Sequence, residues 1–241
     1  RAMEDLKNLT ELDLSHQWIS GEILRAMEDL KNLTELDLGD SGNDGFAGPG
    51  LLPTWISSLT KLELLDLENN AFHGSVPKGW SALKRLRTLR LNNNKLSGPF
   101  PEALLHLTNL QELYLHGNQL SGTIPPGLGA LTNLRVLDLN ENQLSGTIPL
   151  GLSALTNLQD LTLCVEIRDW NNQFIGAIPS ALSALKKLRL FTACPTQIPL
   201  WITTLTNLAA LRLNSMRPAE IDCDQGSDNR RRIPEGLSAQ I

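Results

Sequence analysis

The sequence repeats itself with a period of 24 residues, and this period constrains the fold more than any other feature. Residues 107–125 read LTNLQELYLHGNQLSGTIP, and residues 131–149 read LTNLRVLDLNENQLSGTIP. One such unit cannot bury its leucines alone, whereas a stack of units can. We therefore expect a solenoid of about nine repeats in a single domain spanning residues 1–241. The leucines that open the units are Leu6, Leu30, Leu59, Leu83, Leu107, Leu131, Leu155, Leu185 and Leu205.

The unit reads LxxLxxLxLxxNxLSGxIPxxLxxL, and each part has a physical role. The LxLxx piece alternates apolar and polar residues, as a half-buried strand does, and stacked units would pair these strands into a parallel sheet. The SGxIP piece turns the chain with Gly and stiffens it with Pro. The Asn amide can satisfy backbone groups at the bends of neighbouring coils, which would otherwise be buried unpaired. These structural asparagines are Asn70, Asn94, Asn118, Asn142 and Asn172.

The LSGxIP segment resembles the signature of one family. It reads LSGPFP at 96–101 and LSGTIP at 120–125 and 144–149, with looser forms at 72–77 and 174–179. This pattern resembles the leucine-rich repeats (LRRs) of plant cell-surface proteins. The resemblance implies an α/β fold: a right-handed solenoid with a concave parallel β-sheet, a second short strand at each SGxIP segment, and 3₁₀ or helical turns on the outside.

The regular period breaks at four places. Insertions at 39–50, 164–172 and 214–232 all follow a predicted strand, so they should emerge from one edge near the sheet. Such clustering indicates a binding face, or drift in loops that tolerate added length. The unit opening at Leu185 is short and lacks the Asn and the LSG, so we expect a local irregularity there. The resemblance also implies cysteine-paired caps, which this chain does not show, so we interpret it as an excerpt of a longer protein.

The predicted concave face carries two groups of polar side chains. Like charges on stacked strands repel one another, and either solvent or a basic partner would relieve that repulsion. This possible acidic patch comprises Glu11, Asp13, Glu35, Asp37, Asp66 and Glu68. The central group contains Arg and Tyr, which often anchor interfaces. We expect it to contact a ligand through Arg90, Asn92, Tyr114, His116 and Asp138, with Trp18 and Trp170 as possible contacts at the edge.

Cysteines and sequons bear on the cellular compartment. Cys164 and Cys194 fall at the same strand position in adjacent units, which brings them to roughly disulfide range. A bridge between these two, a bridge between Cys194 and Cys223, or free thiols all remain open. Asn8 and Asn32 begin Asn-Leu-Thr sequons, which are glycosylation sites only if the chain passes through a secretory route.

Several classes of function conflict with the sequence. A formal net charge of −5 argues against nucleic acid as a partner. No apolar run reaches the roughly 18 residues that a membrane span needs, so this segment predicts no membrane insertion. GxSxG, Walker and HExxH motifs are absent, and the cysteines do not form a zinc spacing with His116. The sequence therefore predicts no enzyme, no cofactor and no metal.

The expected function is recognition of a protein, peptide or glycan through the concave face and the insertion-bearing edge. The resemblance implies the LRR domain of a plant-type receptor kinase, receptor-like protein or polygalacturonase inhibitor, acting in signalling or innate immunity at the cell surface or outside the cell. The alternative is a cytoplasmic LRR interaction domain of a signalling protein fused to a Roco-type GTPase, which the near-verbatim repeats and few cysteines would also fit. Ice binding would require a flat Thr or Ser array, whereas these columns are charged and mixed.

Overall fold

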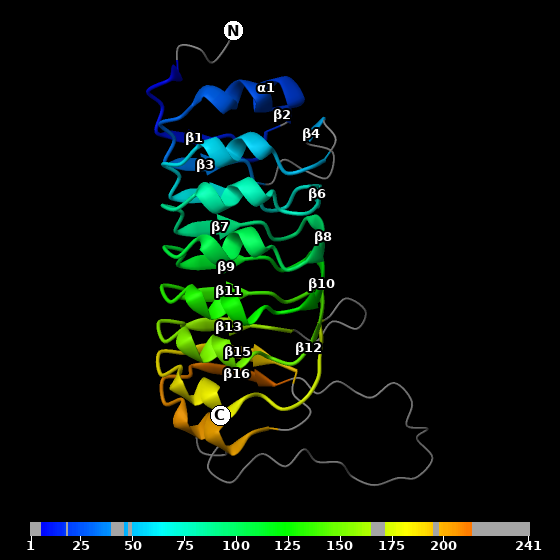
Figure 1. The fold of residues 1–241 in the computed structure, drawn as a ribbon, viewed down its shortest axis with the longest axis vertical. Helices are drawn as coiled ribbons and strands as arrows, with labels where there is room; N and C mark the ends of the chain where they lie inside the picture. The colour runs from blue at the N-terminus through cyan, green and yellow to red at the C-terminus, as the bar shows by residue number, and fades with distance from the viewer. Residues whose placement is uncertain are drawn as a thin grey trace, which may run out of the picture.

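The repeats stack into a solenoid in which every unit adds one strand to a single parallel sheet (Figure 1). The computed structural model describes residues 6–17, 19–39, 46–47, 50–164, 172–194 and 198–213. Within them the sheet has nine strands, and their order in space is their order in the sequence. The strands are β1 (Glu11–Asp13), β3 (Glu35–Asp37), β5 (Leu64–Asp66), β7 (Thr88–Arg90), β9 (Glu112–Tyr114), β11 (Val136–Asp138), β13 (Asp160–Thr162), β15 (Leu190–Ala193) and β16 (Ala210–Leu213).

A second set of strands follows the first at the SGxIP segments. In the described residues a five-stranded parallel sheet contains β6 (His73–Gly74), β8 (Lys95–Pro99), β10 (Gln119–Thr123), β12 (Gln143–Gly146) and β14 (Gln173–Phe174). A separate parallel pair joins β2 (Ile19–Ser20) to β4 (Phe46–Ala47). The predicted second strand is thus confirmed, and among the described residues the last one is β14, before the shortened unit.

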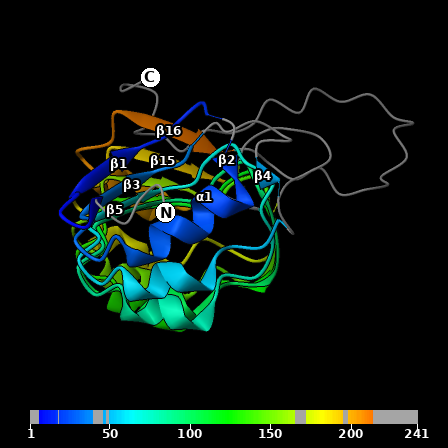
Figure 2. The same ribbon diagram turned by 90° about the horizontal axis from the view of Figure 1, so that it is seen from above.

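Short helical turns complete each coil opposite the main sheet (Figure 2). The first is the α-helix α1 (Gly21–Ala26), and the rest are 3₁₀ turns. They are η2 (Met27–Asp29), η3 (Thr54–Ser58), η4 (Lys78–Ala82), η5 (Glu102–His106), η6 (Pro126–Ala130), η7 (Leu150–Ala154), η8 (Ser180–Ala184) and η9 (Leu200–Thr204). Proline precedes η3 to η9, and because it fixes φ it sets the entry of the chain into each of these turns. The α/β solenoid predicted from the sequence is confirmed.

Leucines fill the space between the sheet and the turns as one continuous core. In β9, for example, Leu113 is fully buried whereas Glu112 and Tyr114 are half-buried on the opposite face. The same alternation recurs because neighbouring strands pair in register, Leu89 with Leu113 and Leu113 with Leu137. Burying one such side chain stabilises the fold by about 2 kcal/mol. The Leu period therefore sets both the strand and its partner.

Buried asparagines join each coil to its neighbours, as the sequence predicts. The Nδ2 of Asn118 donates to the carbonyl oxygens of Leu91, Leu115 and His116 at 2.9, 3.0 and 3.3 Å. Its Oδ1 accepts from the backbone N–H of Leu96 at 3.0 Å. Nδ2 donations to carbonyls of the same and the preceding coil recur at Asn70, Asn94, Asn142 and Asn172, all of them buried. This buried ladder satisfies backbone groups that no strand partner reaches.

A second ladder of asparagines lies at the exposed turn before five of the main strands, and the sequence analysis missed it. Each Nδ2 donates to a backbone carbonyl of the preceding coil at 2.6–3.0 Å. The signal was present in the repeated Thr-Asn dipeptide, which precedes the buried Leu in several units. The residues of this outer ladder are Asn32, Asn109, Asn133, Asn157 and Asn207.

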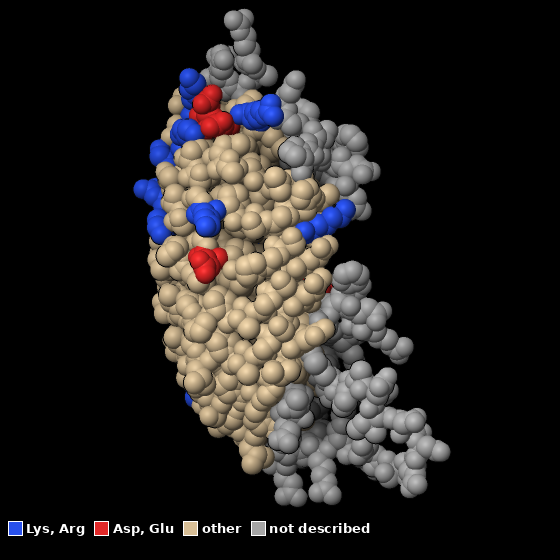
Figure 3. All heavy atoms as spheres, turned by 45° about the vertical axis from the view of Figure 1, so that its right-hand side comes forward, with Lys and Arg blue, Asp and Glu red and all other residues tan. Residues whose placement is uncertain are grey.

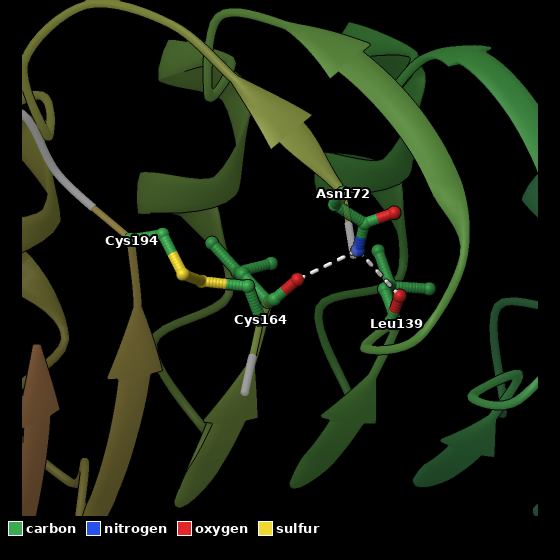
Figure 4. The surroundings of a disulfide bond; sticks show 5 residues. Leu139, Cys164, Asn172 and Cys194 are labelled. Atoms are coloured by element: carbon green, nitrogen blue, oxygen red, sulfur yellow. Dashed lines mark hydrogen bonds between the residues drawn. A yellow bond between two sulfur atoms is a disulfide. The ribbon is translucent and has the colours of Figure 1, made fainter. Parts of the chain in front are cut away.

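A disulfide bridges two adjacent coils where the regular period breaks (Figure 4). Cys164 follows β13 and Cys194 follows β15, with 6.0 Å between their Cα atoms. Beside this bridge Asn172 donates to the carbonyls of Leu139 at 2.7 Å and Leu163 at 2.6 Å. The buried ladder therefore resumes directly after the second insertion. Cys223 lies outside the described residues, as do most of residues 39–50 and 164–172 and all of 214–232.

The two ladders should differ sharply in their effect on stability. Asn118→Ala removes the acceptor of the buried Leu96 N–H and one of the two side-chain amide donors to each of the Leu91 and Leu115 carbonyls, and together these losses should lower the free energy of unfolding by about 3 kcal/mol. Asn109→Ala removes one exposed hydrogen bond and should cost about 1 kcal/mol. Urea denaturation of both variants measures the difference. Equal losses would contradict the assigned role of the buried ladder.

Removing the bridge should destabilise the C-terminal half. The double variant Cys164→Ala/Cys194→Ala should lose about 2–4 kcal/mol, because the bridge closes a loop with a sequence separation of 30. Thermal denaturation of the oxidised protein checks this, with Cys223→Ala as the control that leaves the bridge intact. A double variant as stable as the control would show that the bridge does not form.

Candidate functional site

The main sheet presents one face away from the leucine core, and strand register arranges its side chains in rows along the solenoid. The central row runs through the last residue of each strand from β1 to β11. It contains four carboxylates, one guanidinium and the only tyrosine of the chain. In order these residues are Asp13, Asp37, Asp66, Arg90, Tyr114 and Asp138.

Each aspartate of this row uses one oxygen to close the end of its own strand. The Oδ1 accepts a hydrogen bond from the backbone N–H two residues later at 2.9–3.1 Å. Four Asp-Leu-x segments carry this motif, and the sequence analysis interpreted their carboxylates only as surface charges. One oxygen therefore has a structural role, and only the other is available to a cation. The donors are Ser15, Gly39, Glu68 and Asn140.

Two of these second oxygens lie close to a basic side chain of the protein itself. Asp66 Oδ2 lies 3.0 Å from Arg90 Nη1. Asp138 Oδ2 lies 3.3 Å from His116 Nδ1, which is ion-pair distance but not hydrogen-bond geometry. The Arg90 guanidinium also lies 5.7 Å from the centre of the Tyr114 ring, and that ring meets His116 edge to face at 6.4 Å. The structure thus brings four of the five predicted central residues into one cluster.

Burial raises the pKa values of three residues in and beside this cluster. Desolvation raises the pKa of the Asp66 carboxyl, and the Glu68 amide and Arg90 offset that effect only in part. Desolvation likewise raises the pKa of Asp138 against the attraction of His116. The pKa of Tyr114 is raised by burial first and by the Glu112 charge second, so its hydroxyl is protonated at neutral pH.

One residue of the predicted acidic patch and one of the predicted central group are almost fully buried. Asp66 is 3% exposed and Asn92 is 4% exposed. Asn92 Nδ2 donates to Glu68 Oε2 at 3.1 Å, so it organises its neighbour instead. Neighbouring side chains within a row lie only about 4.8 Å apart, which leaves little room for solvent around these short side chains. Trp18 and Trp170 lie outside the described residues.

No Lys or Arg of the described residues forms an ion pair with the acidic patch that remains exposed. Within the described residues Glu11, Glu35 and Asp37 form no ion pair. Gly39 is packed closely beside them, because a Cβ atom there would lie 3.2 Å from a carboxylate oxygen of both Asp37 and Asp66. The concave face is therefore compensated at its centre and uncompensated at β1 and β3.

No group of three or more His, Cys, Asp or Glu side chains in the described residues is placed to hold a metal ion. None of the described helices is long and apolar enough to cross a membrane. Of the two sequon asparagines, Asn8 is exposed. Asn32 is half-buried, and it donates through Nδ2 to the Lys7 carbonyl at 2.7 Å and accepts from Lys61 Nζ at 2.6 Å.

Two protein-family models match the sequence of this chain. A model described as "Leucine-rich repeat region" matches residues 47–222, and one described as "Leucine Rich Repeat" matches residues 8–30. The chain belongs to the leucine-rich repeat family. Neither matching model indicates a catalytic family. A comparison with curated protein sequences found no match.

Solved structures of plant receptor LRR domains resemble this LRR chain. The plant peptide hormone receptor RGFR1, solved in complex with RGF2, is 29% identical with a TM-score of 0.69, and the match covers 88% of this chain and 37% of that one. The LRR ectodomain of the membrane receptor kinase GASSHO1/SCHENGEN3 from Arabidopsis thaliana, in complex with CASPARIAN STRIP INTEGRITY FACTOR 2, is 28% identical with a TM-score of 0.66 and covers 87% and 27%.

The fold also occurs outside plants. The LRR protein LIC12759 of Leptospira interrogans is 30% identical with a TM-score of 0.62, covering 86% of this chain and 55% of that one. The present chain thus spans roughly a quarter to a half of the lengths of these three structures. The family and the plant-type resemblance predicted from the LSGxIP segments are confirmed.

Two aspartates of the central row should respond to pH in opposite directions. Burial raises the pKa of Asp37, so the folded state binds its proton more tightly than the unfolded state, and ionisation above about pH 4 costs stability. Hydrogen bonds from Ser15 lower the pKa of Asp13, so its ionised form adds stability that is lost as the pH falls through the folded pKa.

Asp37→Asn should therefore stabilise the domain at pH 7, by less than about 1 kcal/mol for this partly exposed group, and the gain should vanish near pH 3. Asp13→Asn should slightly destabilise the domain at pH 7, and that loss should also vanish at low pH. Denaturation at both pH values checks the pair. Shifts of the same sign at pH 7 would contradict the assignment.

Proposed function

We propose that this LRR domain is a non-enzymatic recognition module that binds an extended peptide bearing cationic groups across its concave face. The main observation behind the proposal is that only some of the carboxylates in the central row lie next to a basic side chain of the protein. Arg90 forms an ion pair with Asp66, and His116 Nδ1 lies 3.3 Å from Asp138 Oδ2, whereas no described Lys or Arg forms an ion pair with Asp13 or Asp37 on the same surface. A ligand that places Lys or Arg side chains beside Asp37 completes the pattern, because an unscreened row of like charges is destabilising.

The centre of the face would hold the remainder of the peptide. Tyr114 and His116 are half-buried rings that offer apolar area with little loss of conformational freedom. Arg90 keeps 39% of its side chain exposed although it pairs with Asp66, so it can also meet a peptide carbonyl or carboxylate. The rigid sheet holds these groups in place before binding, which lowers the entropic cost of association.

Peptide ligands also agree with the similar structures. RGFR1 was solved with RGF2, and the GASSHO1/SCHENGEN3 ectodomain with CASPARIAN STRIP INTEGRITY FACTOR 2. By analogy we propose a plant-type receptor or defence protein whose LRR domain acts outside the cell, with no nucleic acid partner. The bridge between Cys164 and Cys194 supports this location, because disulfides persist in oxidising compartments. It disfavours the cytoplasmic Roco-type alternative.

Binding of a synthetic Lys- and Arg-containing peptide to the domain tests the proposal by fluorescence anisotropy. The double variant Glu35→Gln/Asp37→Asn should weaken binding roughly tenfold, and raised salt should weaken it further, because the contacts are between partly exposed charges. Tyr114→Ala should weaken it independently of salt. The matched control is Glu28→Gln/Glu102→Gln, which removes two exposed carboxylates from the outer turns.

Either of two results would refute this function. One is equal weakening in the control and in the concave-face variant, which would reduce the effect to net charge. The other is equal affinity for a peptide in which Glu replaces every Lys and Arg.

A further inference from the structure

A second charged surface lies beside the concave face and has the opposite sign. It consists of the connectors between each outer turn and the following main strand, which we call the basic edge. Ten of the fifteen Lys and Arg residues in the described part of the chain lie in these connectors, although the whole chain has a formal net charge of −5. They are Lys7, Lys31, Lys61, Lys84, Arg85, Arg87, Arg135, Lys186, Lys187 and Arg189.

These charges are barely compensated. Glu63 is the one acidic residue in the described connectors, and it pairs with Arg87 at 3.2 Å with both side chains largely exposed. Figure 3 shows Lys and Arg side chains following one another down the upper left outline of the molecule, where the first connectors lie. A protein that is acidic overall has therefore segregated its cations onto one side.

The lysine ammonium groups are also fixed in position by neutral acceptors on neighbouring coils. Lys31 Nζ donates to Ser58 Oγ at 2.5 Å, Lys61 Nζ to Asn32 Oδ1 at 2.6 Å, and Lys187 Nζ to Asn157 Oδ1 at 2.7 Å. Lys84 and Lys186 donate to backbone carbonyls, each at 3.0 Å. These bonds order the side chains without cancelling their charge. The cations occupy six of the nine described connectors, and the connectors at 107–111, 155–159 and 205–209 carry none.

One part of the edge is hollowed. Gln159, Lys187, Arg189 and Asn207 line an open pocket of about 350 Å³. Two of its four lining side chains are cations and two are amides, so its walls supply hydrogen-bond donors and positive charge and no carboxylate. This chemistry fits a carboxylate or sulfate group.

The composition of the edge indicates the class of partner. Protein interfaces usually centre on aromatic or large apolar anchors. The described connectors carry no aromatic residue, and their one exposed large apolar side chain is Leu6 at the N-terminal end. Single-stranded nucleic acid would call for aromatic stacking platforms, which are missing from these connectors too. What alternates with the cations is Asn, Thr and Gln, which hydrogen-bond well to hydroxyl groups.

We propose that the basic edge binds a linear anionic polysaccharide lying along the solenoid, with its carboxylate or sulfate groups on the Lys and Arg side chains and one such group in the Lys187–Arg189 pocket. This site is separate from the concave face. A peptide in the acidic row and a polyanion on the basic edge would therefore bind without competing.

The test measures binding of the domain to polygalacturonate, dextran sulfate and neutral dextran by biolayer interferometry. The edge variant is Arg85→Gln/Lys187→Gln/Arg189→Gln. The control variant, Arg25→Gln/Lys78→Gln/Lys95→Gln, changes the net charge equally at exposed positions away from the edge. Thermal denaturation of both verifies that they fold. We expect binding to at least one charged glycan and none to neutral dextran, with the edge variant roughly tenfold weaker and the control unchanged.

Salt and pH define the contact further. Raising NaCl should weaken binding steeply, because each contact with an anionic group of the polymer releases counterions. Lowering the pH to protonate uronates should abolish binding of polygalacturonate and spare dextran sulfate, which distinguishes the two sources of negative charge. Equal weakening of edge and control variants would overturn the proposal, and so would duplex DNA binding as tightly as the glycans. Neither result would bear on peptide binding at the concave face.

Discussion

The buried hydrogen bonds of the repeated asparagine hold the rest of the structure in place. A coil of this length must bend several times, and each bend turns backbone groups toward the leucine core where water cannot reach them. A side-chain amide such as that of Asn118 supplies both donors and an acceptor, and it spans from one coil to the next. The coils therefore adopt the same spacing, and that common spacing puts the strands in register.

Function follows from this register, because positions that are equivalent in sequence become neighbours in space. The last residue of each main strand falls in one row, so a sequence change in one unit alters one site along a fixed line. In the present chain the row passes from uncompensated carboxylates at Asp13 and Asp37 to the compensated cluster around Arg90 and Tyr114. The connectors beside the concave face are also equivalent positions of successive units, and many of the Lys and Arg residues lie in them. Two surfaces of opposite charge thus coexist on one rigid scaffold.

The fold was largely predictable from the sequence because the leucines that form its core recur periodically. Leucine spacing determines strands, turns and stacking together, and the break at Leu185 coincides with the end of the second sheet among the described residues. The central cluster was also predictable in outline, since Arg90, Tyr114 and His116 fall on adjacent strands. Sequence could not choose among the cysteine pairings, because that choice depends on the distance across two irregular units. The structure gives the bridge between Cys164 and Cys194.

Burial on the concave face was not predictable. Asp66 and Asn92 occupy positions that the alternation assigns to the outer face, yet both are almost fully buried. In each Asp-Leu-x segment one carboxylate oxygen accepts a backbone hydrogen bond at the end of the strand. That bond depends on the local backbone geometry, which could not be read from the sequence. The outer Asn ladder had a visible signal in the Thr-Asn dipeptide, but its function emerged only from the contacts between coils.

The central claim is that the concave face selects a cationic peptide by completing a partly compensated row of carboxylates. Selection of binders from an unbiased displayed peptide library on the immobilised domain tests this most directly, because it presumes nothing about the ligand. The account predicts enrichment of peptides with Lys or Arg, lost when the same library is selected on the Glu35→Gln/Asp37→Asn domain. Enrichment of acidic or purely apolar peptides, or an unchanged selection on that variant, would contradict it.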